Sequence, residues 1–248
     1  MKLLLINPNT SQSVSDLIGA EARRAAAPGT QISVLTASIG VAYIETRFEA
    51  LIGAYATAMI AAEHWERHDA IVVAAFGDPG IDGLREALSI PVVGLTEAAL
   101  MSACLLGKRF SIIAISHRIT AWYRECVRAN GLHERLASIR NLDQPLRDIG
   151  KVQEDHTEAL HRMCMSTVEV DGADVIIIAG APLAGLARSI KDRIPVPVVD
   201  GVSSAVCHAQ TLASLAPAAA RAGSFAPPPL KPNHGLPDSL ARLLARAR

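Results

Sequence analysis

A chain of 248 residues that is 50% hydrophobic and 19% charged is long enough to bury one large core or two modest ones. Its 24 basic and 24 acidic residues are spread through the sequence, without the long like-charged runs that are typical of nucleic-acid or membrane surfaces. Aromatic residues make up only 4%, which also disfavours a base-stacking platform. We therefore expect a globular protein whose partner is a small neutral or anionic molecule, with no nucleic acid and no membrane involved.

Strands and helices are predicted to alternate along the first half of the chain. Continuous apolar runs indicate buried parallel strands, and Ala-rich segments with apolar residues at helical spacing indicate helices. We expect strands at 2–6, 31–36, 69–75 and 91–94, and helices at 11–26, 48–67, 83–88 and 96–106. Thr10 or Ser11 can cap the first of these helices, and Thr96 the last.

The second half repeats the alternation. Strands are expected at 111–115, 138–141, 174–180 and 196–199, and helices at 120–130, 152–170 and 200–215, with a less apolar connection at 132–151. Residues 216–237 are rich in proline and are predicted to form an extended strap. Residues 238–248 carry Leu240, Leu243 and Leu244 at helical spacing, which predicts a final helix that docks through this stripe.

Two stretches with the same design mark the centre of each half. The stretch DAIVVAAFGDPG is answered by DVIIIAGAPLAG, and in each an apolar strand ends at a small residue, Ala75 or Gly180. The flanking strands repeat at the same offset, which is too long for a solenoid and suits two related α/β half-domains. We expect one half-domain at 1–97 plus about 205–248 and the other at 98–204, with the site in the cleft between them.

The predicted ligand site lies in the turns that follow the strands, because ligands of open parallel sheets bind beyond the carboxyl ends of the strands. These turns are 7–11, 75–80, 94–97, 116–120 and 180–183. They are rich in Gly, Ala and Pro, so backbone N–H groups can approach a ligand closely. They contain neither GxGxxG nor GxxxxGK[ST], so no nucleotide is expected. A cofactor-free site for a small oxygen-rich molecule fits better.

Neither a metal site nor a disulfide is predicted. The cysteines are Cys104, Cys126, Cys164 and Cys207. They lie far apart without metal-ligand spacing, and we expect them to be reduced and mostly buried in helices. His156 and His161 do not share a helix face, so no metal is proposed there. The apolar run at the amino terminus is too short for a signal peptide and no window suits a membrane span, which predicts a cytoplasmic protein.

Several segments carry a family resemblance: the opening LLINPNTS, the loop that ends in Tyr43-Ile44-Glu45, and the stretches AAFGDPG, VVGLTEAAL, DVIIIAGAPLAG and VPVVDGV. In this order they resemble the aspartate/glutamate racemase superfamily and, within it, the hydantoin and allantoin racemases. The resemblance covers Met1 to about Leu215. It implies an isomerase with an α/β fold, in which two Rossmann-like (flavodoxin-like) parallel-sheet half-domains are related by pseudo-twofold symmetry. It also implies no cofactor and, together with the docking tail and apolar helices, a homo-oligomer.

The doubled architecture suits racemisation. Removing a proton from one face of a carbon and returning one to the other face requires two groups on opposite sides of the substrate. In the family these groups are cysteines, one at the end of each central strand, where a thiolate can act as base and a thiol as acid. A hydantoin-like ring, a ureide or a related carboxylate suits this chemistry because the carbon lies beside a carbonyl, whose oxyanion the turn N–H groups can stabilise.

This sequence departs from the family at both positions. The first family cysteine falls at Ala75 and the second at Gly180, so neither expected acid/base group is present. Three explanations stay open: Ala75 is an inactivating change, a different group performs different chemistry, or the site only binds. A single nucleophile at position 75 would suit a hydrolase, a lyase or a decarboxylase. Candidates for a second catalytic group are His117, Ser116 and Asp78.

The predicted substrate-binding residues are Pro8, Asn9, Thr10, Tyr43, Glu45, Phe76, Gly77, Ser116, Ala181, Pro182 and Leu183. Structural roles compete with several of these functions. Asp78 before Pro79 has the pattern of a helix N-cap, and Ser116 can belong to a turn. His117, at a strand end in the cleft, can be an ordinary surface histidine. The turn after the first strand could grip one end of a substrate or form only an Asx-type turn, and the loop with Glu45 could close over the cleft.

Overall fold

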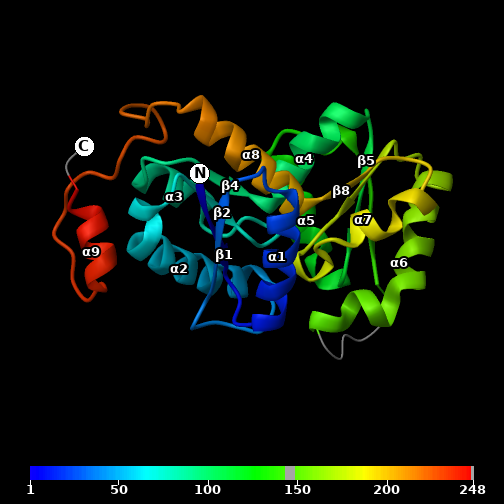
Figure 1. Cartoon of the computed structure of the whole chain (residues 1–248), viewed down its shortest axis with the longest axis horizontal. Coiled ribbons are helices and arrows are strands. Elements are labelled where there is room, and N and C mark those ends of the chain that lie inside the picture. Colours follow the sequence, from blue (N-terminus) through cyan, green and yellow to red (C-terminus); the bar gives the residue numbers. More distant parts are fainter. Residues whose placement is uncertain (143–148, 247–248) are drawn as a thin grey trace.

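The computed structural model describes residues 1–142 and 149–246, so part of the connection predicted at 132–151 lies outside the described residues. The chain forms two four-stranded sheets in which neighbouring strands are parallel, one in each half of the molecule (Figure 1). The strands are β1 (Lys2–Asn7), β2 (Gln31–Thr36), β3 (Ala70–Val73), β4 (Val92–Gly94), β5 (Phe110–Ala114), β6 (Leu136–Asn141), β7 (Val175–Ile178) and β8 (Val198–Asp200). Their orders, β2-β1-β3-β4 and β6-β5-β7-β8, are equivalent. The predicted α/β fold with two parallel-sheet halves is confirmed.

Helices connect the strands. They are α1 (Gln12–Ala25), α2 (Arg47–His64), α3 (Ile81–Ala87), α4 (Leu95–Leu106), α5 (Thr120–Ala129), α6 (Val152–Glu169), α7 (Leu186–Ile190), α8 (Gly201–Leu215) and α9 (Asp238–Leu244). Ser11 caps α1, since its side chain accepts a hydrogen bond from the N–H of Val14. The predicted cap at Thr96 is wrong, because α4 begins at Leu95 with Gly94 in the cap position. The sequence pattern does not predict the short helix α7.

The apolar core is continuous from one half to the other. All residues of β3 and β7 are buried, as their uninterrupted apolar runs predict. One cluster of buried side chains contains residues of both sheets and of α1, α4 and α8, the helices that lie between the halves in Figure 1. The halves are therefore joined by packing, and the predicted domain boundaries stay predictions.

A buried carboxylate adds a polar contact between the halves. Glu21 of α1 accepts hydrogen bonds from Arg24 and from Ser203 of α8. The guanidinium of Arg188 in α7 lies 3.5 Å from the same carboxylate. Burial raises the pKa of Glu21, but the hydrogen bonds from Arg24 and Ser203 outweigh it, so its pKa lies below the usual range. The carboxylate is therefore ionised at neutral pH and ties α1 to α7 and α8.

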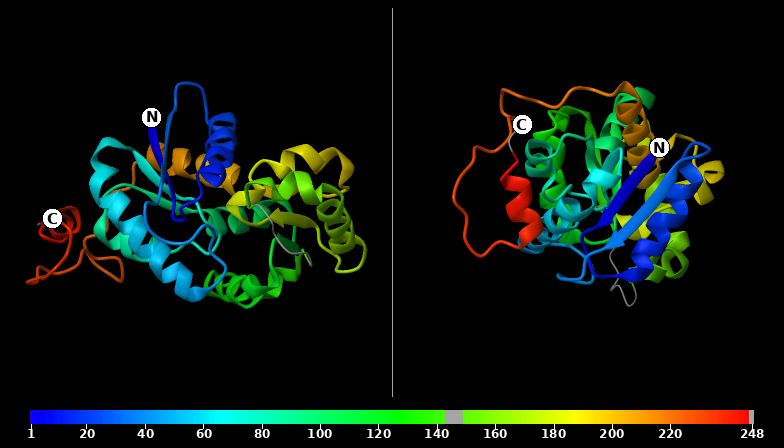
Figure 2. Two further views of the ribbon diagram at one scale, coloured as in Figure 1. Left: turned by 90° about the horizontal axis from the view of Figure 1, so that it is seen from below. Right: turned by 60° about the vertical axis from the view of Figure 1, so that its left-hand side comes forward.

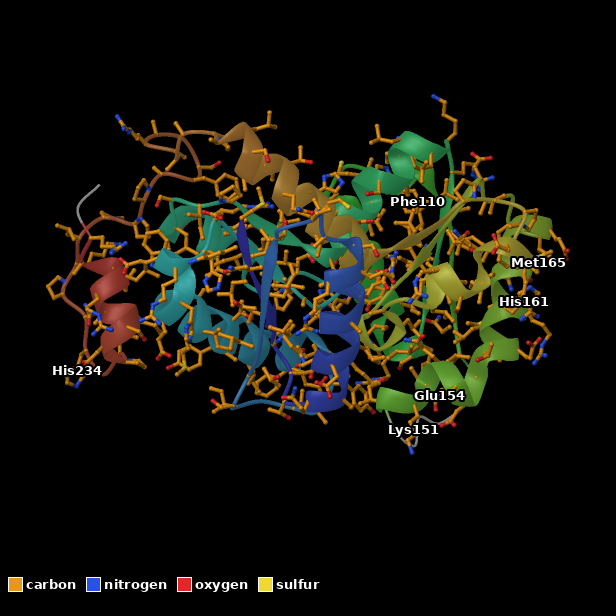
Figure 3. The ribbon with its side chains drawn as sticks, in the orientation of Figure 1. Phe110, Lys151, Glu154, His161, Met165 and His234 are labelled. Carbon is orange, nitrogen blue, oxygen red and sulfur yellow. The ribbon has the colours of Figure 1, made fainter. Side chains whose placement is uncertain are left out.

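The carboxyl-terminal segment runs around the first half. After α8 the chain follows the outside as the predicted strap, and α9 packs against α2 (Figures 1 and 2). Leu243 joins the apolar cluster on this side of the first sheet, and Arg246 lies 4.6 Å from the ring centroid of Trp65. The predicted docking of the final helix is confirmed for Leu243, whereas Leu244, the last residue of the predicted stripe, is exposed. His234 marks the outer turn of the strap beside α9 (Figure 3).

Leu243→Ala is expected to lower the free energy of unfolding by about 2 kcal/mol, because it removes a buried leucine from the docked helix. The matched control is Leu244→Ala, at a side chain that is 36% exposed against 9% for Leu243. The control should stay within about 0.5 kcal/mol of the unmodified chain. Chemical denaturation followed by circular dichroism measures both, and equal losses would contradict docking through Leu243.

Candidate functional site

The ends of the central strands are equivalent in the two halves. The residues that follow β3 and β7, Ala74 and Ala179, each donate a backbone hydrogen bond of 2.8 Å to the neighbouring strand, β1 or β5. Both are fully buried. The next residues, Ala75 and Gly180, are the first to reach solvent: Ala75 is 8% exposed and Gly180 is half-buried. The two positions singled out in the sequence thus occupy matching points at the carboxyl edges of the two sheets.

The turn after Ala75 is tied to the start of α4. Gly77 and Asp78 have φ values of +106° and +48°, a left-handed backbone that is uncommon for a residue other than glycine. The N–H of Gly77 donates to Thr96 Oγ1 at 2.5 Å. The carboxylate of Asp78 accepts from the backbone N–H groups of Thr96 and Glu97 at 2.8 and 3.0 Å. These bonds fix the path of the turn.

Asp78 therefore caps a helix other than the one that follows it. The cap position of α3 is Gly80, so the predicted N-cap of the following helix is wrong, and Asp78 caps α4 instead. A methyl group on Gly94 would collide with this carboxylate, which explains the glycine before α4. Burial raises the pKa of Asp78 to about 7, against the opposing effect of the hydrogen bonds from Thr96 and Glu97.

In the second half, a carboxylate at the end of β8 holds the turn that follows β7. Asp200, at the end of β8, accepts from the backbone N–H of Gly185 at 2.7 Å and from that of Ser203 at 2.9 Å. In the second half the carboxylate thus comes from Asp200, at the end of β8. In the first half it comes from Asp78, in the turn after β3. The predicted binding residues after Gly180, 181–183, form a single turn of 3-10 helix and are buried.

The turn after β1 is an Asx-type turn. Asn9 Oδ1 accepts from Asn7 Nδ2 at 3.0 Å and from the N–H of Ser11 at 2.9 Å. Pro8 and Asn9 are buried, whereas Thr10 is exposed. Of the three predicted binding residues in this turn, Thr10 therefore offers its side chain to solvent.

The loop before α2 holds Tyr43 and Glu45, both half-buried. The N–H of Glu45 donates to the carboxylate of Glu49, which also completes a capping box with Thr46. A backbone hydrogen bond from Thr10 ties this loop to the turn after β1. Burial and the charge of Glu45 raise the pKa of Tyr43, so its hydroxyl stays neutral.

The candidates at the end of β5 differ in exposure. Ser116 is buried, and its Oγ accepts from the N–H of Arg118 at 3.2 Å at the start of a 3-10 turn. His117, next to it, is exposed. Thr120 Oγ1 accepts from Asn141 Nδ2 at 2.9 Å, which links the start of α5 to β6. Ser116 is thus occupied by the turn, and His117 faces solvent.

Helix α5 supplies two residues that sequence analysis does not single out. The indole of Trp122 lies against Gly77, and the ring of Tyr123 lies against Phe76 with the ring centroids 4.6 Å apart. The sequence does contain one indication: Trp122 and Tyr123 are adjacent aromatic residues shortly after a strand end, in a chain with few aromatic residues. It does not indicate that their partners lie in the other half.

The cysteines lie in helices away from the strand ends, as predicted. Burial raises the pKa of Cys126 and of Cys164 to about 12, so both thiols are protonated at neutral pH. Cys104 is half-buried, but Cys207 is exposed, and for that residue the prediction of burial is wrong. Within residues 1–142 and 149–246, no three His, Cys, Asp or Glu side chains form a group that could hold a metal. No helix in this described part of the chain is both long and apolar enough to cross a membrane.

Comparisons with known proteins agree with the doubled architecture. A model of the Asp/Glu/hydantoin racemase family matches residues 3–209. The hydantoin racemase of Paenarthrobacter aurescens is 34% identical over 230 residues, which cover 92% of this chain and 98% of that protein. The hydantoin racemase of Pseudomonas sp. (strain NS671) is 30% identical over 243 residues, 98% of each. The structure of allantoin racemase from Klebsiella pneumoniae has a TM-score of 0.92 at 33% identity, covering 97% of this chain and 98% of that one. The predicted resemblance is confirmed, and this chain belongs to the Asp/Glu/hydantoin racemase family.

Proposed function

We propose that this chain binds a small cyclic amide or ureide of the hydantoin type, or a related carboxylate, between the turns at Ala75 and Gly180. With acid/base groups at both positions, a site of this kind would suit cofactor-independent proton transfer at a carbon next to a carbonyl. One observation carries the proposal: the two positions are equivalent strand ends of two matching sheets, so each can face one side of a ligand. The substrate class follows from the similarity to a hydantoin racemase and an allantoin racemase.

The character of the turns supports a ligand of this type. Gly180 has left-handed backbone, and the absence of a side chain there lets backbone atoms approach a planar ring closely. Carbonyl and N–H groups of such a ring can be recognised by backbone groups without a charged side chain. We assign Thr10, which is exposed, and Tyr43, whose hydroxyl stays neutral, to the rim of the site.

Neither strand end carries a side chain that could transfer a proton. Ala75 has only a methyl group and Gly180 has none. The carboxyl group of Asp78, with a pKa of about 7, is held at the start of α4 by two backbone N–H groups, and the raised pKa of Cys126 keeps its thiol protonated. We therefore propose that the chain as it stands binds its ligand without rapid proton exchange. This observation also favours the second candidate function, a ligand-binding member of a racemase family.

Calorimetric titration with hydantoin and with allantoin tests the binding, and NMR detection of deuterium uptake at the ring carbon next to the carbonyl tests the chemistry. We expect at least one compound to bind with a dissociation constant of about 1 mM or lower. Deuterium uptake should be no faster than in buffer. Ala75→Leu should abolish binding because the larger side chain fills the strand end. Lys191→Ala, at an exposed position, should bind like the unmodified chain.

Each other outcome has a distinct meaning. Exchange catalysed by the unmodified chain would reveal an acid/base pair other than the two strand-end residues. Ring opening or release of carbon dioxide would replace proton transfer by bond cleavage. Failure of both compounds to bind would contradict the proposed ligand class.

A further inference from the structure

One face of α5 packs against the first half of the molecule. The indole of Trp122 lies on Gly77, and the ring of Tyr123 lies on Phe76 at an interplanar angle of 51°. Helix α5 follows β5 of the second sheet, whereas Phe76 and Gly77 follow β3 of the first. These contacts therefore cross from one half to the other, and they do so directly beside Ala75.

Gly77 forms the recess that receives Trp122. A methyl group on its α-carbon would collide with the six-membered ring of the indole, and its φ of +106° also favours glycine. The hydrogen bond from its N–H to Thr96 Oγ1 anchors the recess to α4. The indole thus meets a fixed surface, at the turn where we place the ligand.

An exposed ion pair lies at the edge of the same contact. Arg47, the first residue of α2, donates from Nε and Nη2 to the two carboxylate oxygens of Glu125, at 2.9 and 2.6 Å. Both side chains are more than half exposed, with values of 56% and 55%. The bidentate geometry is directional, but an exposed pair is weak and is screened by salt. This polar contact of α5 is therefore one that salt weakens.

The contact at Glu21 differs in kind. Its carboxylate is buried between α1, α7 and α8, and hydrogen bonds from Arg24 and Ser203 satisfy it. Salt screens a buried ion pair much less than an exposed one. The polar contact at Glu21 is therefore less sensitive to salt than the Arg47–Glu125 pair, which lies on the helix next to Ala75.

We propose that α5 is a clasp on the ligand site: Trp122 positions the turn at Ala75 from the other half of the molecule, and the Arg47–Glu125 pair holds α5 in place. Ligand enters and leaves when the clasp opens, so the observed affinity depends on the fraction of molecules in which it is closed. The inference rests on the proposed function in one respect, the position of the bound ligand. The clasp itself can be measured without ligand.

Fluorescence measures the clasp without ligand. The sequence contains 2 tryptophans, so Trp65→Phe leaves Trp122 as the single reporter. Acrylamide quenching of Trp122 should increase about twofold between roughly 0.05 and 0.5 M NaCl, because screening weakens the ion pair. Adding Glu125→Ala should give the higher quenching at both salt concentrations. Adding Arg193→Ala instead, which breaks an equally exposed pair with Glu158 inside the second half, should leave the salt response unchanged.

Binding of hydantoin and allantoin gives the second measurement in the same Trp65→Phe background. Both compounds are uncharged, so salt should act on the clasp rather than on attraction of the ligand. The dissociation constant should rise about twofold over the same salt range and should be insensitive to salt after Glu125→Ala. Trp122→Ala should weaken binding about tenfold, whereas Trp122→Phe should restore most of the affinity because a ring again fills the recess.

Salt-independent quenching of Trp122 would overturn the proposal. So would a Glu125→Ala variant that behaves like Arg193→Ala, or unchanged affinity after Trp122→Ala. If Trp122→Ala does not fold, equal affinity of Trp122→Phe at low salt and after Glu125→Ala would count against the clasp in the same way. If neither compound binds, the proposed function fails, while the quenching measurement still decides whether α5 opens.

Discussion

The double variant Ala75→Cys/Gly180→Cys is expected to exchange the proton next to the carbonyl of a hydantoin at least about 10²-fold faster than the unmodified chain. The two positions are equivalent strand ends, so a thiolate on one side can remove the proton while a thiol on the other side returns one. Deuterium uptake by NMR measures the exchange, and the loss of optical rotation of a single enantiomer measures racemisation. The four native cysteines are present in every variant and cannot account for a difference.

The two single variants separate the roles of the thiols. Each should exchange more slowly than the double variant and should not racemise, because one thiol cannot serve both faces of the carbon. At Gly180 an added methyl group would lie 3.7 Å from Pro182 Cδ, an ordinary van der Waals contact, but φ is +100°, so cysteine fits there at a backbone cost of about 1–2 kcal/mol. The double serine variant is the matched control. Equal exchange by the serine and cysteine variants would contradict the assignment of these positions.

Sequence locates the ends of β3 and β7 two residues too late, at Ala75 and Gly180 instead of Val73 and Ile178, and it comes this near because the pattern is local. A parallel strand buried on both faces has a continuous apolar run with an abrupt end, and β3 and β7 are such strands. The positions of Ala75 and Gly180 at the carboxyl edges follow from counting along these runs. The repeat of the same pattern in the second half then predicts two similar sheets without any knowledge of how they pack.

Contacts between distant segments are the part that sequence does not give. Thr96 is of a residue type that often caps helices, but the side chain that caps α4 is that of Asp78, 18 residues earlier. Trp122 touches Gly77 across the two halves. These partners become neighbours only when both sheets have formed, so no local pattern names them. For Asn9 the sequence left two roles open, and the structure shows the Asx-type turn, in which its side chain accepts hydrogen bonds from Asn7 and Ser11.

Asp78→Ala is expected to lower the free energy of unfolding by about 2–4 kcal/mol. It leaves the backbone N–H groups of Thr96 and Glu97 without their acceptor, and it places alanine at φ +48°, which aspartate tolerates better. Chemical denaturation at about pH 5, below the folded pKa of Asp78, measures the loss. Asp82→Ala, at an exposed carboxylate in the first turn of α3, is the matched control and should cost less than about 0.5 kcal/mol. Equal losses would contradict the capping of α4 by Asp78.

The pH dependence of this contribution has a definite sign. Burial raises the pKa of folded Asp78 from 3.8 to about 7, so between these values the folded chain keeps a proton that the unfolded chain has released. The stability that Asp78 contributes is therefore complete below the unfolded pKa and is lost as pH rises through the folded pKa. The difference in unfolding free energy between the unmodified chain and Asp78→Asn should fall by up to about 1.4 kcal/mol per pH unit and level off above about pH 8. A difference that grows with pH would mean that the two N–H donors and the positive end of α4 keep the carboxylate ionised, and the turn beside Ala75 would then hold a fixed negative charge at every working pH.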